Sequence, residues 1–232
     1  MSNFVFPPAD IPSAAVRGTD ARYAVARIFC VGRNYADHAR EMGADPTREP
    51  PFYFTKPASA LTPSGSTVPY PPATKNYHYE MELVIAIGAP VFKVTPEAAR
   101  AAIWGYATGL DMTRRDLQAV AKAGGKPWDT AKGFDQSAVL GDIVRVSEVG
   151  LLEKGAITLA VNGAEKQRGD LADMIWSQAE IVSNLSHLYH LHPGDLIYTG
   201  TPAGVGAVVA GDVITGHIEG LGDIQLTVGQ PE

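Results

Sequence analysis

The chain has 232 residues and a formal net charge of −6, and hydrophobic residues make up 45% of it, an ordinary share for a globular protein. The lack of a basic cluster argues against nucleic acid as a partner. No apolar run approaches the length of a membrane span, and the N-terminus lacks the pattern of a signal peptide. We therefore expect a soluble cytoplasmic protein without a membrane partner.

Glycine and proline are frequent, with 24 and 17 residues, which indicates many turns and favours a β-rich fold over a helical bundle. The length fits one domain and also permits two. Because no shift in composition divides the chain, we expect an irregular lead-in over residues 1–26 and a single domain over residues 27–232. The lone Cys30 excludes an internal disulfide and, within an apolar run, indicates a buried structural thiol.

The first half of the chain has short apolar runs that end at glycine or proline, a pattern typical of strands. In chain order it predicts a strand at 26–32, a short helix at 34–43, a strand at 52–57, a loop to about residue 75 and a strand at 78–88. A further helix is expected from Thr95, a hydroxyl N-cap followed by proline and an acid, to a point near Gly105.

The second half continues with a strand at 106–112, and Thr113 is expected to cap a helix that closes at Gly124. An Asn-Gly pair within residues 157–167 predicts a hairpin. A capping box then starts a helix whose expected buried residues are Ile181, Leu185 and Leu188. Short strands follow, from residue 196 onward. Because strands outnumber helices in irregular order, we predict an α+β fold.

Glu80 and Glu82 stand two residues apart where the strand 78–88 enters its apolar run, so their side chains share one face, with Cα atoms ~7 Å apart. A solvated edge is the simpler interpretation, because exposed carboxylates cost little. If they are buried, their repulsion raises a pKa or demands a hard cation such as Mg²⁺. Asp111, at the end of the next strand, is then the best third ligand, although it could instead only help to cap a helix.

His38 and Glu41 are three residues apart in a predicted helix and therefore share a face. A carboxylate that fixes the tautomer of a neighbouring histidine lets that histidine act as a general base. The simpler interpretation is that His38 and Glu41 form an exposed pair on the helix surface. Motifs of serine hydrolases, zinc helices and phosphate loops are absent. The histidines at 187, 190 and 192 fall near the C-terminal end of a helix, where a histidine interacts favourably with the helix dipole. This explains their position, so we do not expect a metal there.

Several segments, taken together and in order, carry these residues: CVGRNYADHAREM, FYFTKPASAL, YHYEMEL, GLDMTRRDLQ, PWDTAKGFD, LAVNGAEKQ and TGTPAGVG. Over about residues 27–218 they resemble the fumarylacetoacetate hydrolase family, and within it the small acylpyruvate hydrolases. GRNYADHAREM and FTKP are also similar to fumarylpyruvate and maleylpyruvate hydrolases of the gentisate pathway. The resemblance implies a mixed β-sandwich roll, a homodimer, and one Mg²⁺ or Mn²⁺ per subunit in a catalytic domain over residues 27–232.

The resemblance also implies roles for single residues. The metal ligands would be Glu80, Glu82 and Asp111. His38 and Glu41 would activate a water from a mobile lid that Gly32 and Gly43 bracket as hinges, and Lys132 would be a further catalytic group. Substrate contacts would come from Arg115, Gln118 and Thr201, the last at the pyruvoyl end. The far carboxylate of a fumaryl or maleyl group would need a cation, for which the candidates are Arg33, Lys56, Arg114 and Lys126.

The implied substrate is a 2,4-diketo acid whose C–C bond is hydrolysed to release pyruvate. Hydroxide generated by His38 would attack the distal carbonyl, Lys132 would hold the oxyanion, and the metal would stabilise the pyruvate enolate that leaves. Two alternatives stay open at this point. An oxaloacetate decarboxylase or ketonising isomerase would use the same metal without an activated water, and a binding protein would leave the whole set of residues idle.

Overall fold

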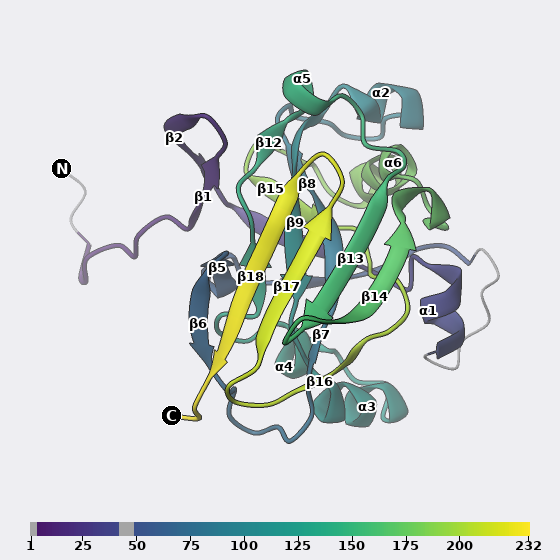
Figure 1. Cartoon of the computed structure of the whole chain (residues 1–232). Helices are drawn as coiled ribbons and strands as arrows, with labels where there is room; N and C mark the ends of the chain where they lie inside the picture. The colour runs from purple at the N-terminus through teal and green to yellow at the C-terminus, as the bar shows by residue number, and fades with distance from the viewer. Residues whose placement is uncertain (1–3, 42–48) are drawn as a thin grey trace.

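The computed structural model describes residues 4–41 and 49–232 (Figure 1). Its centre is a mixed eight-stranded sheet. The strands lie in the order β4 (Phe52–Lys56), β3 (Arg27–Gly32), β15 (Asp195–Tyr198), β8 (Met81–Ile87), β9 (Ile103–Asp111), β11 (Ala138–Leu140) and β5 (Leu61–Pro63), and β12 (Val144–Arg145) also pairs with β9. Parallel and antiparallel neighbours alternate irregularly, as expected for an α+β fold.

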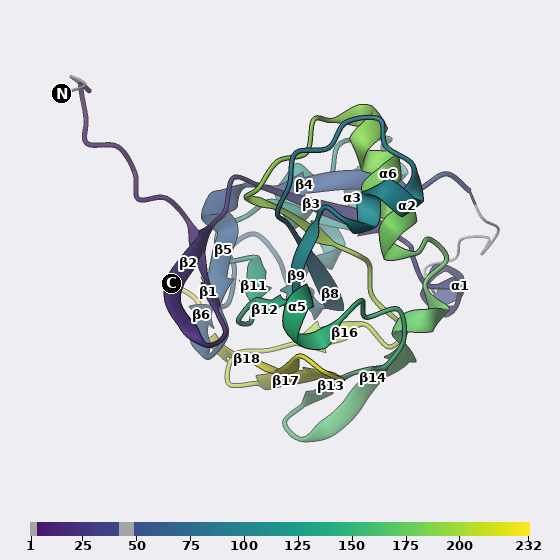
Figure 2. The same ribbon diagram turned by 90° about the horizontal axis from the view of Figure 1, so that it is seen from above.

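A second sheet of five strands forms a separate layer beside the central one (Figure 2). Its order is β14 (Ala164–Asp170), β13 (Ala156–Val161), β17 (Val213–Ile218), β18 (Gly222–Gly229) and β6 (Ser66–Pro69). Two small sheets complete the strands: the hairpin of β1 (Ser13–Val16) with β2 (Thr19–Ala24), and a three-stranded sheet of β10 (Thr113–Arg114), β7 (Tyr77–Tyr79) and β16 (Gly206–Val208).

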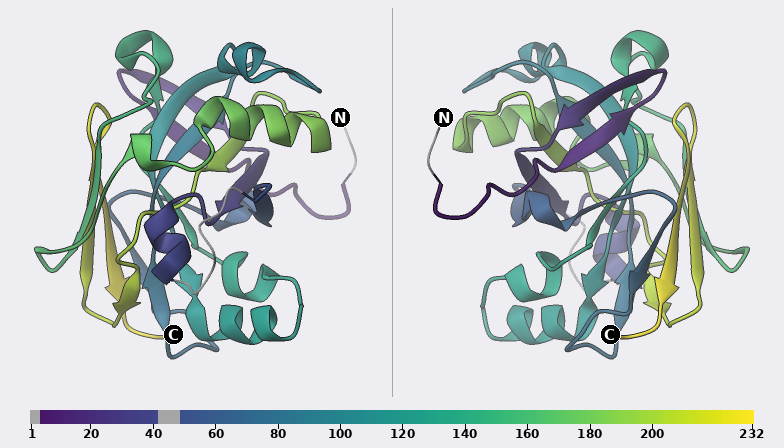
Figure 3. Two further views of the ribbon diagram at one scale, coloured as in Figure 1. Left: turned by 90° about the vertical axis from the view of Figure 1, so that its right-hand side faces the viewer. Right: turned by 90° about the vertical axis from the view of Figure 1, so that its left-hand side faces the viewer.

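The helices are short and lie at the ends and edges of the sheets. They are α1 (Ala36–Glu41), α2 (Pro96–Arg100), α3 (Arg115–Ala123), α4 (Asp129–Lys132), α5 (Val146–Val149) and α6 (Gln178–Leu188), with 3₁₀ turns at Ala58–Ala60 and Leu171–Asp173. In the left view of Figure 3, α3 and α4 lie together at the bottom, α6 lies in the upper half below α2 and α5, and α1 lies at a level between α6 and the bottom pair. This arrangement leaves one end of the central sheet facing α1, α3 and α4.

Strand β8 explains why both faces of the central sheet are apolar. Its side chains alternate between two buried clusters: Leu83, Ile85 and Ile87 face the five-stranded sheet, whereas Val84 and Ala86 face the other core. A strand that is buried on both faces has a continuous run of apolar residues, and the sequence of β8 shows this pattern. The predicted α+β sandwich is therefore confirmed, with its main core between the two sheets.

Several local expectations differ from the structure. Residues 13–24, expected to be irregular, form the β1–β2 hairpin, whose Ala14 and Val16 join the second core. Thr113 does not cap α3, because it lies in β10 and the helix begins only at Arg115. The helix α2 ends at Arg100, since the chain turns into β9 at Ile103.

The helix α6 begins at the predicted capping box and buries Ile181 and Leu185. Leu188 is 62% exposed and is the last residue of the helix. The expectation that Leu188 is buried was therefore wrong. No helix in the described part of the chain is both long and apolar enough to span a membrane.

Candidate active site

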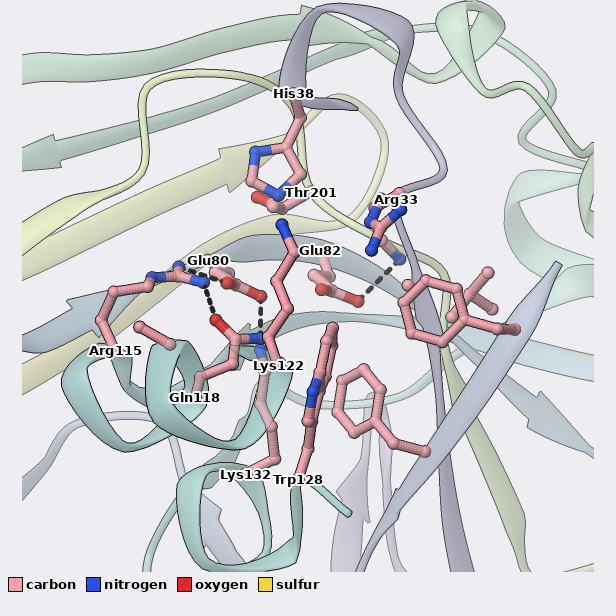
Figure 4. Close-up of a pocket in the computed structure, with 16 residues that line it drawn as sticks. Arg33, His38, Glu80, Glu82, Arg115, Gln118, Lys122, Trp128, Lys132 and Thr201 are labelled. Carbon is pink, nitrogen blue, oxygen red and sulfur yellow. Dashed lines mark hydrogen bonds and ion pairs between the residues drawn. The ribbon is translucent and has the colours of Figure 1, made fainter. Parts of the chain in front are cut away.

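A cavity of about 160 Å³ opens at the end of the central sheet that faces α1, α3 and α4 (Figure 4). Of the thirteen residues that the sequence singled out, eight line it: Arg33, His38, Glu80, Glu82, Arg115, Gln118, Lys132 and Thr201. Of the other five, Glu41 contacts His38, and Asp111 contacts Lys132. The structure therefore brings these ten residues together at one site.

The three acids come from two neighbouring central strands. Glu80 lies at the crossing from β7 to β8, Glu82 lies within β8, and Asp111 ends β9. The antiparallel register pairs Glu82 with Gly109, and the Asp111 amide donates to the carbonyl of Glu80 at 2.9 Å. All three side chains are buried, and one carboxylate oxygen from each lies within 4.8 Å of the others. The interpretation of a solvated edge is therefore wrong.

Glu80 is held as an anion by two cations. Arg115 Nη2 donates to its Oε1 at 2.5 Å, and Lys132 Nζ donates to its Oε2 at 2.8 Å. Burial alone would raise the pKa of Glu80, but Lys132 and Arg115 outweigh it and hold the pKa well below its ordinary value. This carboxylate therefore stays charged while buried.

Glu82 is in the opposite electrostatic situation. Its Oε2 accepts a 2.8 Å hydrogen bond from the Gly200 amide, and Gly200 adopts a φ of 95° beside Asn34. Burial raises the pKa of Glu82 well above its usual range, and the charges of Asp111 and Glu80 raise it further. Without an additional cation, the site therefore disfavours its full negative charge.

Asp111 is completely buried between two lysines. Lys132 Nζ donates to its Oδ2 at 2.8 Å, and Lys56 Nζ lies 2.8 Å from Oδ1. The angle to Lys56 does not suit a hydrogen bond, so among the described residues Oδ1 has no donor. An orphaned carboxylate oxygen beside a charge-disfavoured Glu82 fits a hard divalent cation, which takes oxygen ligands. The acids Glu80, Glu82 and Asp111 therefore fit a metal site.

Replacing Lys56 by methionine tests this charge balance. We expect the free energy of unfolding of the metal-free protein to fall by about 3–5 kcal/mol, because removing one partner leaves Asp111 buried with less compensation. Saturating Mn²⁺ should reduce the loss, since a bound cation would neutralise the same carboxylate. Urea unfolding with chelator and with Mn²⁺ measures both values, with the exposed Lys154→Met as control. An equal loss in both conditions would contradict a cation at Asp111.

The candidate base His38 is buried on α1, and its Nδ1 lies 3.1 Å from Oε2 of Glu41. A carboxylate only accepts, so this contact places the proton on Nδ1 and leaves Nε2 to accept one. The Glu41 carboxylate also accepts from the Gly204 amide at 3.1 Å. The pair is therefore oriented by a second loop and is not a freely exposed surface pair. Of the two proposed hinges, Gly32 packs against the Phe52 ring, and Gly43 lies outside the described residues.

Two buried polar residues that the sequence did not single out position this site. Asn34 is fully buried between β3 and α1, where its Nδ2 donates to the carbonyls of Thr199 and Trp176 at 2.9 and 3.0 Å. Gln167 donates from Nε2 to Thr201 Oγ1 at 2.8 Å and accepts from the Met81 amide at 3.0 Å. Asn34 thus ties α1 to the loop after β15, and Gln167 ties that loop to the acidic strand.

The remaining cations differ in their placement. Arg115 Nη1 donates to Gln118 Oε1, so both side chains lie on the α3 wall of the cavity. Of the candidates for a far carboxylate, only Arg33 lines this cavity. Lys56 is buried beneath it, and Lys126 lines the adjoining outer pocket. Arg114 does not line the cavity either, since its guanidinium lies 4.2 Å from the centre of the Phe134 ring.

Comparison with known proteins places the chain in a family. It matches the model described as fumarylacetoacetate (FAA) hydrolase C-terminal over residues 27–229. A fumarylpyruvate hydrolase of Ralstonia sp is 56% identical over 188 residues, which cover 81% of this chain and 97% of the relative. A crystal structure of fumarylpyruvate hydrolase from Pseudomonas aeruginosa in complex with Mn²⁺ and pyruvate has a TM-score of 0.96 at 50% identity, covering 98% of this chain and all of the other.

A more distant relative carries a different name. An oxaloacetate tautomerase of Escherichia coli is 39% identical over 199 residues, which cover 85% of this chain and 90% of the relative. The family model and the identities agree with the fold and with the segments that the sequence carries. The chain therefore belongs to the fumarylacetoacetate hydrolase family.

Proposed function

We propose that this protein hydrolyses fumarylpyruvate or maleylpyruvate to pyruvate plus fumarate or maleate, as a step in gentisate-type aromatic catabolism. The chain is a hydrolase of ketonic C–C bonds, and the names of its relatives support an acylpyruvate as the substrate. The observation that carries the proposal is one cavity in which a buried three-acid site lies beside an oriented His–Glu pair.

The cofactor is a divalent cation, Mg²⁺ or Mn²⁺, for which Glu80, Glu82 and Asp111 would be the ligands. When bound, it would supply positive charge for the carboxylate and the neighbouring ketone of the substrate and for the enolate that forms. Thr201 and Gly200 line the same cavity and would position the pyruvoyl end, with Arg115 and Gln118 on the α3 side.

The protein's own groups would carry the proton transfers. Nε2 of His38 would take a proton from a water while Glu41 stabilises the resulting imidazolium. The hydroxide would add to the distal carbonyl, and the C–C bond would break with its electron pair passing into the enolate of pyruvate, which then takes a proton. Lys132 remains our candidate for the oxyanion. Its three N–H donors are directed to Glu80, Asp111 and Thr113. Lys132 would therefore have to give up one of these three hydrogen bonds in order to bind the substrate oxygen.

A second candidate function is enolate chemistry on oxaloacetate, either decarboxylation or ketonising isomerisation. The relatives named oxaloacetate tautomerases support it, and the acidic site suits it because neither reaction needs an activated water. The His38–Glu41 pair favours hydrolysis, since that reaction requires a base for water.

We further propose that the protein is a homodimer. Phe4, Val5, Phe6 and Ile11 are 63–92% exposed on an N-terminal arm that leaves the body of the molecule (Figure 1), and a second copy would offer apolar surface to cover them.

The experiment that tests the function starts from chelator-treated protein. It is given fumarylpyruvate, maleylpyruvate, acetylpyruvate and oxaloacetate, each with and without Mg²⁺ or Mn²⁺, and pyruvate is measured together with the co-product. Metal-dependent release of fumarate or maleate is the expected result and identifies the acyl group. Release of pyruvate and carbon dioxide from oxaloacetate alone would overturn the hydrolase in favour of the second candidate.

A further inference from the structure

We propose that Lys122 of α3, together with Arg33, binds the far carboxylate of a dicarboxylic acylpyruvate and thereby selects it over acylpyruvates with a neutral acyl group. This inference deepens the proposed function and rests on it. It assigns a specificity residue that lay outside the candidates that the sequence suggested, and it follows from the face that α3 turns toward the cavity.

Helix α3 presents one continuous stripe to the cavity, made of Arg115, Gln118, Ala119 and Lys122. Spacings of three, four and seven residues place side chains on one helix face. Arg115, in the first turn, contacts Glu80 of the metal site. With a rise of ~1.5 Å per residue, Lys122 lies about 10 Å farther along the helix axis than Arg115. The stripe therefore leads from the acids outward, over a length comparable with that of an extended dicarboxylic chain.

The middle of this path suits a flat acyl chain. Ala119 has the smallest side chain of the stripe and so leaves space between Gln118 and Lys122. Phe52, Phe54 and Trp128 form the facing aromatic wall, with the Phe52 and Trp128 rings 5.3 Å apart edge to face. Aromatic side chains give an apolar, rigid surface for a conjugated double bond.

The two ends of the path differ in the cations that border them. Near the acids, Arg115 and Lys132 are bound to Glu80, so they compensate the carboxylates of the protein. Figure 4 shows Lys122 reaching from α3 into the cavity, with its Nζ directed toward the side where His38 and Thr201 lie. If His38 acts at the distal carbonyl, the acyl chain beyond that carbonyl passes this ammonium group. A second substrate carboxylate would find its cation there.

Arg33 adds a second cation from the loop between β3 and α1. Its guanidinium lies 5.2 Å from the centre of the Phe52 ring, where it borders both the cavity and the adjoining outer pocket. Its φ of 58° is uncommon for a residue with a side chain, and Asn34 next to it is fixed by buried hydrogen bonds. Arg33 therefore starts from a fixed stretch of backbone where the cavity meets the outer pocket.

The test compares two substrates that differ at the far end. Fumarylpyruvate carries the second carboxylate and acetylpyruvate does not, so kcat/KM is measured for both with Mn²⁺ in wild type and Lys122→Met. We expect kcat/KM for fumarylpyruvate to fall about 10-fold, mainly through KM, and that for acetylpyruvate to stay within about twofold. Lys122→Glu should enlarge the selective loss. Methionine is also a good helix former, so melting temperatures should match that of wild type.

The outcomes separate this inference from the proposed function. Equal losses on both substrates would place Lys122 at the reacting end, and unchanged kinetics would leave it without a role; either result overturns the inference while hydrolysis stands. A selective loss in Lys126→Met in place of Lys122→Met would also overturn it, because Lys126 lines only the outer pocket. Wild type that hydrolyses none of fumarylpyruvate, acetylpyruvate and maleylpyruvate would overturn the proposed function itself.

Discussion

Replacing Glu82 by glutamine is expected to abolish metal binding and hydrolysis while the fold survives. The amide keeps the size of the side chain and can still accept the hydrogen bond from the Gly200 amide. It removes one of three negative ligands, and neutral oxygens hold a hard divalent ion less well. Because a divalent cation at this position would stabilise the reacting oxygens by several kcal/mol, kcat/KM for an acylpyruvate should fall about 10³-fold or more.

The same variant gives a readout without substrate. Mn²⁺ at about 100 times its Kd should stabilise wild type by ~2.7 kcal/mol, which corresponds to a rise of roughly 5–10 °C in melting temperature for a chain of this size. Glu82→Gln should lose this rise. Its metal-free melting temperature should stay close to that of wild type, because the amide resembles the protonated carboxyl that a raised pKa favours. Normal turnover with added metal would rule out this metal site.

Replacing His38 by glutamine is the second large effect that we expect. Loss of a general base should lower kcat for acylpyruvate hydrolysis by roughly 10²–10⁴-fold, since glutamine cannot accept the proton of water. The Mn²⁺-induced rise in melting temperature should persist, because His38 is not among the three acids. Hydrolysis at the parent rate would show that His38 is not the base.

Two comparisons sharpen the result for His38. Any oxaloacetate decarboxylation or isomerisation should survive in His38→Gln, because enolate formation needs no activated water. Glu41→Gln should cost less than His38→Gln, since its amide oxygen can still accept from the Gly204 amide and from the histidine. Equal losses of both activities in His38→Gln would mean that the histidine acts on the substrate and not on water.

The acidic site could be predicted from the sequence because its information is local. Two glutamates at a spacing of two must share a strand face, and an aspartate at the end of the next strand meets them in an antiparallel pair. The sequence did not decide whether the three carboxylates are buried, because residue spacing does not show whether a strand end faces water. The register and the cover provided by α1 and α3 decide it, and both depend on tertiary packing.

Asn34 and Gln167 could not be predicted in the same way. Each stands among other polar residues in a loop or hairpin, and its hydrogen-bond partners are more than 30 residues away in the chain. The signal that identifies them is burial with every hydrogen bond satisfied, which only the folded structure provides. Thr113 shows the reverse error, because a good N-cap residue was drawn into β10 by pairing with His78.

The separation of the α3 stripe from the acidic strands has an evolutionary consequence. The proposed metal ligands Glu80, Glu82 and Asp111 lie on or beside two adjacent strands at the centre of the sheet, where a substitution disturbs a core that is buried on both faces. Lys122 and Arg33, which we propose to meet the far end of the acyl chain, lie on a helix and on a loop outside that sheet. On our proposal, new substrates can arise by mutation at the periphery while the acidic site is kept, in keeping with relatives named as hydrolases and as tautomerases.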